Sequence, residues 1–273
     1  MNNLQIQDIT TLFVLLDDSL TSTKKHPGRP STLTDSEMVT ILMWSTVILN
    51  QKHIIGIYDC IKRYHHNDFP KLPNYANFVA HCNRMIPLLW ELLENTLDKD
   101  SLLQFVDSTM LPVCKLVRAN RHKVSKGIAS FGKNHQGWHY GFKLHATMND
   151  QGRLCGFYFT EASFYDAQAL PHLIRGKVKV IVGDGTYNAS VMRTKIWKTH
   201  GVFVLAPPHP KQKKKVLAKW QHLLLRARPK IECMFDYLKN HLNLVTSFPR
   251  SIKGYFFNYL RTLLAYQLRP LFF

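Results

Sequence analysis

The sequence predicts an α/β fold, in which a mixed β-sheet flanked by helices follows an all-helical domain. Apolar residues recur at helical spacing up to about residue 100. Short strand-like runs that alternate with helical stretches follow from there to the end of the chain. A chain of 273 residues that is 45% hydrophobic can bury a substantial core, which excludes a disordered protein. We expect a helical domain at residues 1–100 and a second domain at residues 101–273.

The first domain shows helical signals in order. Thr34 and Glu37 have the spacing of a capping box ahead of MVTILMWSTVIL. Amphipathic runs follow at residues 53–64 and 74–85, and Pro87 is expected to break the helix before LLWELLENTL. The second of these runs could read a DNA end as part of a helix-turn-helix, or it could simply pack. The HPGRPST segment is typical of a linker.

The second domain begins with strands. Strand-like runs occur at LLQFVDS, WHYGFKLHATM, LCGFYFT, KVKVIV and GVFVLAP. NDQG at residues 149–152 predicts a hairpin turn. DAQALPHLI, which Asp166 would cap, and ASVMRTKIWKTH are expected helices between the later strands. This order of three antiparallel strands and then crossover units is the one expected of a ribonuclease H-like domain.

Charge is distributed unevenly along the chain. The formal net charge is +18, and residues 101–273 hold 27 Lys and Arg against 7 Asp and Glu. That part should therefore bind a polyanion. The interval between Asp107 and Asp150 has no acid, and its cations include Arg121, Lys123, Lys126 and Lys133. The run HPKQKKK, with Lys213, Lys214 and Lys215, is either a solvated linker or an arm that contacts phosphates.

Three acids stand out in this basic region. Asp107 and Asp184 come at the ends of predicted strands, and Glu232 lies on the predicted helix RPKIECMFDYLKN. A right-handed crossover places KVKVIV beside the first strand, so the three carboxylates could meet at one sheet edge. Singly, each could be a turn acid or a surface charge, and Asp236 could replace or assist Glu232. Carboxylates suit Mg²⁺ or Mn²⁺, and two such ions about 3.5 to 4 Å apart can drive phosphodiester displacement.

The stretches VDST, GKNHQGWHYGFKLHA, VGDGTY and RARPKIECMFDYLK resemble DDE-type insertion-sequence transposases, most of all the insertion-sequence-982 group. The resemblance implies a ribonuclease H-like catalytic domain with Asp107 bridging two metal ions, while Asp184 and Glu232 each complete one. It implies hydrolysis of a phosphodiester at each transposon end, followed by transfer of the 3′-hydroxyl into target DNA.

The resemblance also implies DNA contacts. In the family pattern YxxRxxxExxxxxxK, Arg228 and Lys239 fit the basic positions, whereas Leu225 replaces the tyrosine. Arg228 could instead form a surface ion pair with Glu232. The resemblance favours Lys143 and His145, which share one face of WHYGFKLHATM, near the substrate, but a core role is equally open from the residues alone. Tyr187 could stack on a base or pack.

The expected partners are double-stranded DNA, as transposon ends and target, and a second copy of the chain in the synaptic complex. Residues 252–268 could add an apolar helix to that packing, but their polar interruptions predict no membrane span. Five cysteines without a CxxC pair indicate reduced thiols, and we expect a cytoplasmic, nucleoid-associated bacterial protein. The alternatives are a stand-alone ribonuclease H-like nuclease and a non-catalytic domesticated DNA-binding protein.

Overall fold

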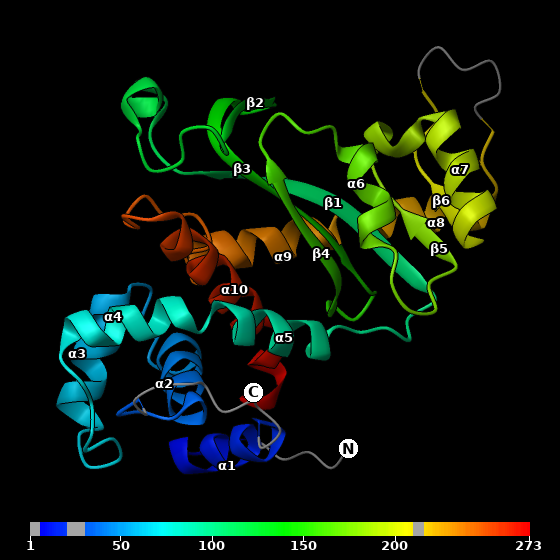
Figure 1. The fold of residues 1–273 in the computed structure, drawn as a ribbon. Coiled ribbons are helices and arrows are strands. Elements are labelled where there is room, and N and C mark those ends of the chain that lie inside the picture. The colour runs from blue at the N-terminus through cyan, green and yellow to red at the C-terminus, as the bar shows by residue number, and fades with distance from the viewer. Residues whose placement is uncertain (1–5, 21–30, 210–215) are drawn as a thin grey trace. The chain divides into compact units, whose positions relative to one another are not determined.

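The computed structural model describes residues 6–20, 31–209 and 216–273 and divides into two compact units (Figure 1). The helical unit comprises Met1–Thr96, Asn240–Leu244 and Ser251–Phe273, and the sheet unit comprises Leu97–Lys239 and Val245–Arg250. Lys213, Lys214 and Lys215, like most of the HPGRPST segment, lie outside the described residues.

The helical unit is built from helices that begin at the predicted signals. Its main helices are α1 (Ile9–Leu20), α2 (Asp35–Val47), α3 (Ile54–Tyr64), α4 (Tyr75–Arg84), α5 (Ile86–Thr96) and α10 (Ile252–Leu268). The capping box is present, because the Thr34 hydroxyl accepts the Glu37 N–H at 3.1 Å and the Glu37 carboxylate accepts the Thr34 N–H at 2.6 Å. Pro87 lies in the first turn of α5, directly after the break between α4 and α5.

Helix α10 groups with the helical unit, although the sequence places it in the range expected for the second domain. Most of its apolar side chains are buried, and a contribution of this helix to packing with a second copy stays a prediction. Arg261 is also buried, and it donates to the Thr46 hydroxyl at 2.6 Å and to the Asn258 side chain at 2.8 Å. These bonds explain how a guanidinium can sit in an apolar helix.

Within the described ranges, the structure contains no helix that is both long and apolar enough to cross a membrane.

The sheet unit contains a curled mixed sheet. Its strands are β1 (Leu103–Pro112), β2 (Ser130–Asn134), β3 (Gly137–Met148), β4 (Leu154–Glu161), β5 (Val180–Val182) and β6 (Phe203–Leu205). They lie in the order β2-β3-β1-β5-β6, and β4 pairs with the rest of β3. Strands β1 to β4 pair antiparallel, whereas β5 is parallel to both β1 and β6. The arrangement is compatible with a ribonuclease H-like fold and contains all five predicted strands.

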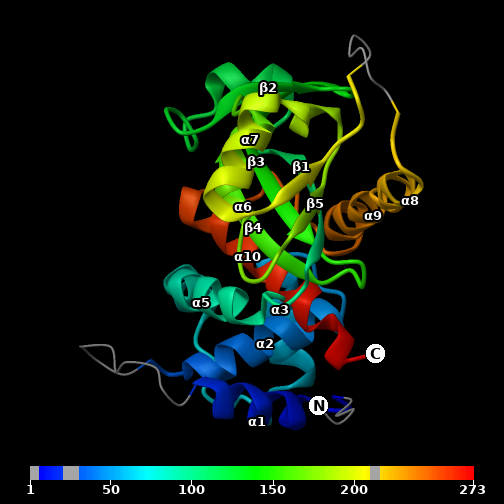
Figure 2. The same cartoon turned by 90° about the vertical axis from the view of Figure 1, so that its right-hand side faces the viewer.

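Helices cover both faces of this sheet. They are α6 (Asp166–Leu173), α7 (Ser190–His200), α8 (Lys219–Ala227) and α9 (Lys230–Asp236). Figure 2 shows α6 and α7 on one face, and α8 and α9 on the other, where α9 contacts β1.

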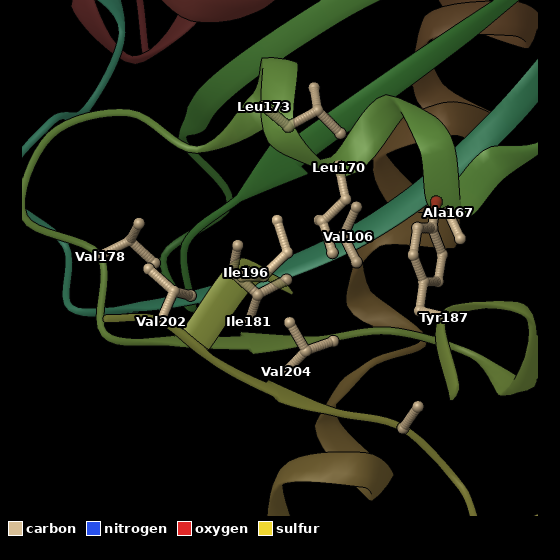
Figure 3. Close-up of a cluster of buried hydrophobic side chains, with 11 residues drawn as sticks. Val106, Ala167, Leu170, Leu173, Val178, Ile181, Tyr187, Ile196, Val202 and Val204 are labelled. Atoms are coloured by element: carbon tan, nitrogen blue, oxygen red, sulfur yellow. The ribbon is translucent and has the colours of Figure 1, made fainter. Parts of the chain in front are cut away.

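A core cluster fills the space between the sheet and helices α6 and α7 (Figure 3). Val106 of β1 and Ile181 of β5 face Leu170 of α6 and Ile196 of α7 in this cluster. Because successive side chains of a strand point to opposite faces, Asp107 is directed away from this core, toward the face that α9 covers.

Candidate active site

Asp107 lies in the middle of β1, not at a strand end as the sequence suggested. Strand β1 continues to Pro112 because β3 pairs with it that far, whereas the parallel ladder with β5 stops at the pair of Phe105 and Val182. Asp107 is two residues beyond Phe105, and Asp184 is two residues beyond Val182. The two acids therefore occupy equivalent positions where neighbouring parallel strands part.

Asp184 caps the short 3₁₀ turn η2 (Gly185–Asn188). Its carboxylate accepts the Thr186 N–H at 2.9 Å and the Thr186 hydroxyl at 3.3 Å. The residue before it must be glycine, because a Cβ on Gly183 would lie 2.6 Å from the Tyr187 ring. A Cβ on Gly185 would meet open space. Packing of the Tyr187 ring thus fixes where Asp184 emerges from the sheet.

Tyr187 packs in the core cluster and is not exposed to stack on a base. Its hydroxyl has no hydrogen-bond partner within the described part of the chain. Burial raises the pKa of this phenol well above its usual value, and the charges of Asp166, Asp107 and Asp184 raise it further. The phenol is therefore neutral, and it lies within electrostatic range of two of the candidate acids.

Glu232 lies in the first turn of α9. The predicted helix RPKIECMFDYLKN begins in the structure at Lys230, two residues later than expected, after Arg228 and Pro229 separate α9 from α8. The Arg228 guanidinium donates to the Glu232 carboxylate at 2.6 Å and lies 3.5 Å from the Asp107 carboxylate. The expected ion pair between Arg228 and Glu232 is therefore present, and the same guanidinium links α9 to β1.

Asp107 has an unfavourable environment for a charged carboxylate. Burial raises its pKa to about 6, and the charges of Asp184 and Glu232 also raise it. The Ser108 N–H, which donates to Asp107 at 2.8 Å, and the Arg228 guanidinium act in the opposite direction. Asp107 is thus close enough to Asp184 and to Glu232 for the charge of each to act on it.

The donor set suits a hard divalent cation, since it offers three carboxylates and no thiol or imidazole. Among the residues that the structure describes, however, no three His, Cys, Asp or Glu side chains lie close enough to hold a metal ion. Arg228 contacts two of the three carboxylates and acts as their cation in this arrangement. The side chain of Glu232 is 56% exposed, whereas that of its partner Arg228 is 16% exposed.

Lys143 and His145 lie inside the fold. The β1–β3 register pairs them with Met110 and Ser108, so they face away from Asp107. Their shared face was predicted correctly, but alternation alone cannot say which face that is. His145 hydrogen-bonds Thr160 at 2.9 Å, and burial lowers its pKa to about 4. DNA contacts by these two residues stay a prediction and would require the fold to open here.

The Lys143 ammonium donates to the Asp166 carboxylate and to the Phe164 carbonyl, each at 2.8 Å. Asp166, expected to cap α6, is instead its first helical residue, and the cap residue Tyr165 makes no side-chain cap bond. The acid serves as the counterion of Lys143, because a buried ammonium needs a partner. This pair could not be predicted from the sequence, since its members are 23 residues apart.

The other predicted DNA contacts that the structure describes lie on the sheet unit's surface or at its margin. Arg121, Lys123, Lys126 and Lys133 are exposed, and the Lys133 ammonium lies 5.8 Å from the centre of the Trp138 ring. Lys239 is half-buried in the π-helical turn Tyr237–His241, and burial lowers its pKa. Exposed aromatic side chains at Trp138 and Phe131 accompany these cations, a feature not recognised from the sequence.

Comparison with known families gives one match. The model of a family described as "Transposase DDE domain" matches residues 98–252, more than half of the chain, and the matched range contains Asp107, Asp184 and Glu232. No curated protein matches the chain.

Proposed function

The chain belongs to the transposase DDE-domain family, and from this premise we propose that it cuts a phosphodiester at each transposon end and joins the freed 3′-hydroxyl to target DNA. The insertion-sequence-982 group remains the proposed subgroup. Two copies of the chain would hold the two ends during the joining step.

The observation that carries the proposal is the meeting of three distant segments near Asp107. Asp184 has the equivalent position on the neighbouring strand, and Arg228 bonds Glu232 while it approaches Asp107. Burial raises the pKa of Asp107, and carboxyl groups with raised pKa values beside other charged side chains are frequent at functional sites, which supports the proposal.

Each acid has a distinct part in this proposal. Asp107, mostly buried on β1, provides a fixed oxygen donor, and Asp184 is held in place by Thr186. Glu232 is the adjustable donor, because its side chain is 56% exposed, whereas that of Asp107 is 17% exposed. Two Mg²⁺ or Mn²⁺ ions bound by these oxygens would activate the attacking water or 3′-hydroxyl and stabilise the leaving oxygen.

Arg228 could exchange its two carboxylate partners for a phosphate of bound DNA. Without DNA its guanidinium neutralises Asp107 and Glu232, and a DNA phosphate is a bidentate anion of the kind that guanidinium binds well. We assign Arg228 to the phosphate next to the cut, with Lys239 as a second contact. DNA binding would thereby free the carboxylates.

The test uses the DNA that flanks the coding region, where a transposon of this kind would carry inverted repeats. With Mg²⁺ the wild type should nick at the repeat ends, and Asp184→Ala should bind the same DNA but lose cleavage. Asp236→Ala is the matched control on α9 and should still cleave the DNA. Loss of cleavage in this variant would indicate that Asp236 is a metal ligand. Normal cutting by Asp184→Ala would remove Asp184 from the mechanism.

A second assay separates a transposase from a stand-alone nuclease. DNA ends that are already cut should be joined to a plasmid target by the wild type with Mg²⁺. Cutting without joining would identify a nuclease, and neither activity would identify a DNA-binding protein that has lost its chemistry.

A further inference from the structure

The turn that carries Asp184 is poorly supported by the sheet. The paired part of β5 ends at Val182, and the Gly183 N–H makes the next backbone bond, to the Leu205 carbonyl at 2.9 Å. Beyond that residue, η2 depends on its own internal bonds and on contacts from other segments. The position of the Asp184 carboxylate must therefore be set by those contacts.

One such contact comes from the loop before α6. The Tyr165 hydroxyl donates to the Thr186 carbonyl at 3.1 Å, and the Thr186 N–H and hydroxyl in turn hold the Asp184 carboxylate. Tyr165 thus hydrogen-bonds Thr186, the residue that orients the Asp184 carboxylate. It touches neither that carboxylate nor Asp107 through any hydrogen bond in the described structure.

The loop that carries Tyr165 is itself held from β3. Lys143 donates to the carbonyl of Phe164 and to the carboxylate of Asp166, the residues on either side of Tyr165. Lys143 is only 7% exposed, so its ammonium is committed to these two acceptors. Its bonds fix both neighbours of Tyr165 and leave the phenol directed at η2.

We propose that Lys143 and Tyr165 are positioning residues, which hold the Asp184 turn in the place where its carboxylate can act. The linkage runs from β3 through the loop before α6 to Thr186 and then to Asp184. Hydrogen bonds join Lys143 to the loop, the loop to Thr186, and Thr186 to Asp184, and within the loop the backbone joins Tyr165 to its two neighbours. It deepens the function proposed above and rests on it for the role of Asp184. The resemblance places Lys143 at the substrate. In this proposal Lys143 acts from the face of the sheet opposite to Asp107.

Tyr165→Phe is the sharpest test, since it removes one hydroxyl from a half-exposed side chain and should not unfold the protein. Tyr158→Phe is the matched control, because Tyr158 lies on β4 and stacks on His172. We expect the amides of residues 185–188 to exchange hydrogen about tenfold faster in Tyr165→Phe, and at the wild-type rate in Tyr158→Phe. Equal exchange in Tyr165→Phe and wild type would overturn the proposal.

Metal dependence gives a second readout. In Tyr165→Phe the Mn²⁺ concentration for half-maximal DNA cleavage should rise about tenfold, while the Kd for DNA stays unchanged and high Mn²⁺ restores the rate. A lower rate that Mn²⁺ cannot restore would contradict a positioning role. If the wild type cuts no DNA, the proposed function fails, and the exchange measurement still decides whether Tyr165 holds the turn.

Lys143→Met tests the first step of the linkage. It leaves Asp166 without its ammonium, so some loss of stability is expected, and exchange is measured under conditions where the variant remains folded. Faster exchange of residues 185–188 supports the linkage. Faster exchange confined to residues 164–168 would show that Lys143 fixes the loop alone and would remove it from the proposal.

Discussion

At the residue scale, Asp107 is a carboxylate in a mostly buried position. The sequence singled out this acid, and Asp184 and Glu232 with it, as candidate ligands because carboxylates are scarce in residues 101–273, and their role as ligands stays a prediction. The contact from Arg228 could be suggested from helical spacing. The buried Lys143–Asp166 pair could not, since which face of β3 meets α6 depends on long-range packing.

The raised pKa of Asp107 predicts a pH-dependent penalty on stability. The folded chain keeps this proton up to about pH 6, whereas an unfolded aspartate releases it near 3.8. The folded state thus binds more protons between these values, and stability falls as pH rises through them. Asp107→Asn has no charge to bury and should be more stable than the wild type at pH 8, by up to about 3 kcal/mol.

Urea unfolding of metal-free protein at pH 8 and at pH 4 measures this difference. The advantage of Asp107→Asn should shrink toward pH 4, where the wild-type carboxyl is protonated. A variant less stable than the wild type at pH 8 would show that Arg228 more than offsets the burial of Asp107.

The two glycines beside Asp184 should respond differently to the same change. Gly183→Ala places a methyl group 2.6 Å from the Tyr187 ring, so it should destabilise the fold by about 1 to 3 kcal/mol and reduce cleavage. Gly185→Ala enters open space and should change stability by less than about 1 kcal/mol. Thermal unfolding and cleavage assays compare the two, and equal effects would contradict the role given to Tyr187 packing.

At the element scale, the break between α8 and α9 places Arg228 against β1. Pro229 has no N–H to donate and begins a new helix, so Arg228 can meet both Asp107 and Glu232. The proline was visible in the sequence, but the approach of Arg228 to Asp107 of β1 was not. Strand β2 was also missed, because SFGKN has little strand character and forms by pairing with the free edge of β3.

Arg228 should compete with metal ions for the carboxylates. In DNA-free protein, Arg228→Gln removes the cation from Asp107 and Glu232, so Mn²⁺ should bind about tenfold more tightly. Arg226→Gln, an exposed arginine in the last turn of α8, is the control and should bind Mn²⁺ like the wild type. Titration followed by electron paramagnetic resonance measures free Mn²⁺, and unchanged or weaker binding in Arg228→Gln would refute the competition.

At the scale of the whole molecule, the excess positive charge belongs to residues 101–273, which include most of the sheet unit. The sequence showed this distribution and the strand order. It could not show that α10 joins the helical unit, because that depends on the burial of Arg261 among residues far away in the chain. A division near residue 100 could thus be predicted from the sequence, whereas the assignment of α10 to the helical unit could not.

The exposed cations predict a steep salt dependence of DNA binding. The affinity should fall with a logarithmic slope of about −0.9 for each phosphate contact. Lys126→Gln combined with Lys133→Gln should make that slope less negative by nearly two contacts, as measured by fluorescence anisotropy between 50 and 200 mM salt. An unchanged slope in this double variant would show that the DNA binds elsewhere on the protein.

Diffraction from crystals of the protein with its DNA ends and Mn²⁺, recorded at the manganese edge, most directly tests whether the three acids form one metal centre. We predict anomalous peaks about 2 Å from carboxylate oxygens of Asp107 and Asp184. Glu232 should be released from Arg228 and bound to one of the manganese ions. Manganese bound away from Asp107, or an Arg228 that still holds Glu232 beside the occupied site, would contradict it.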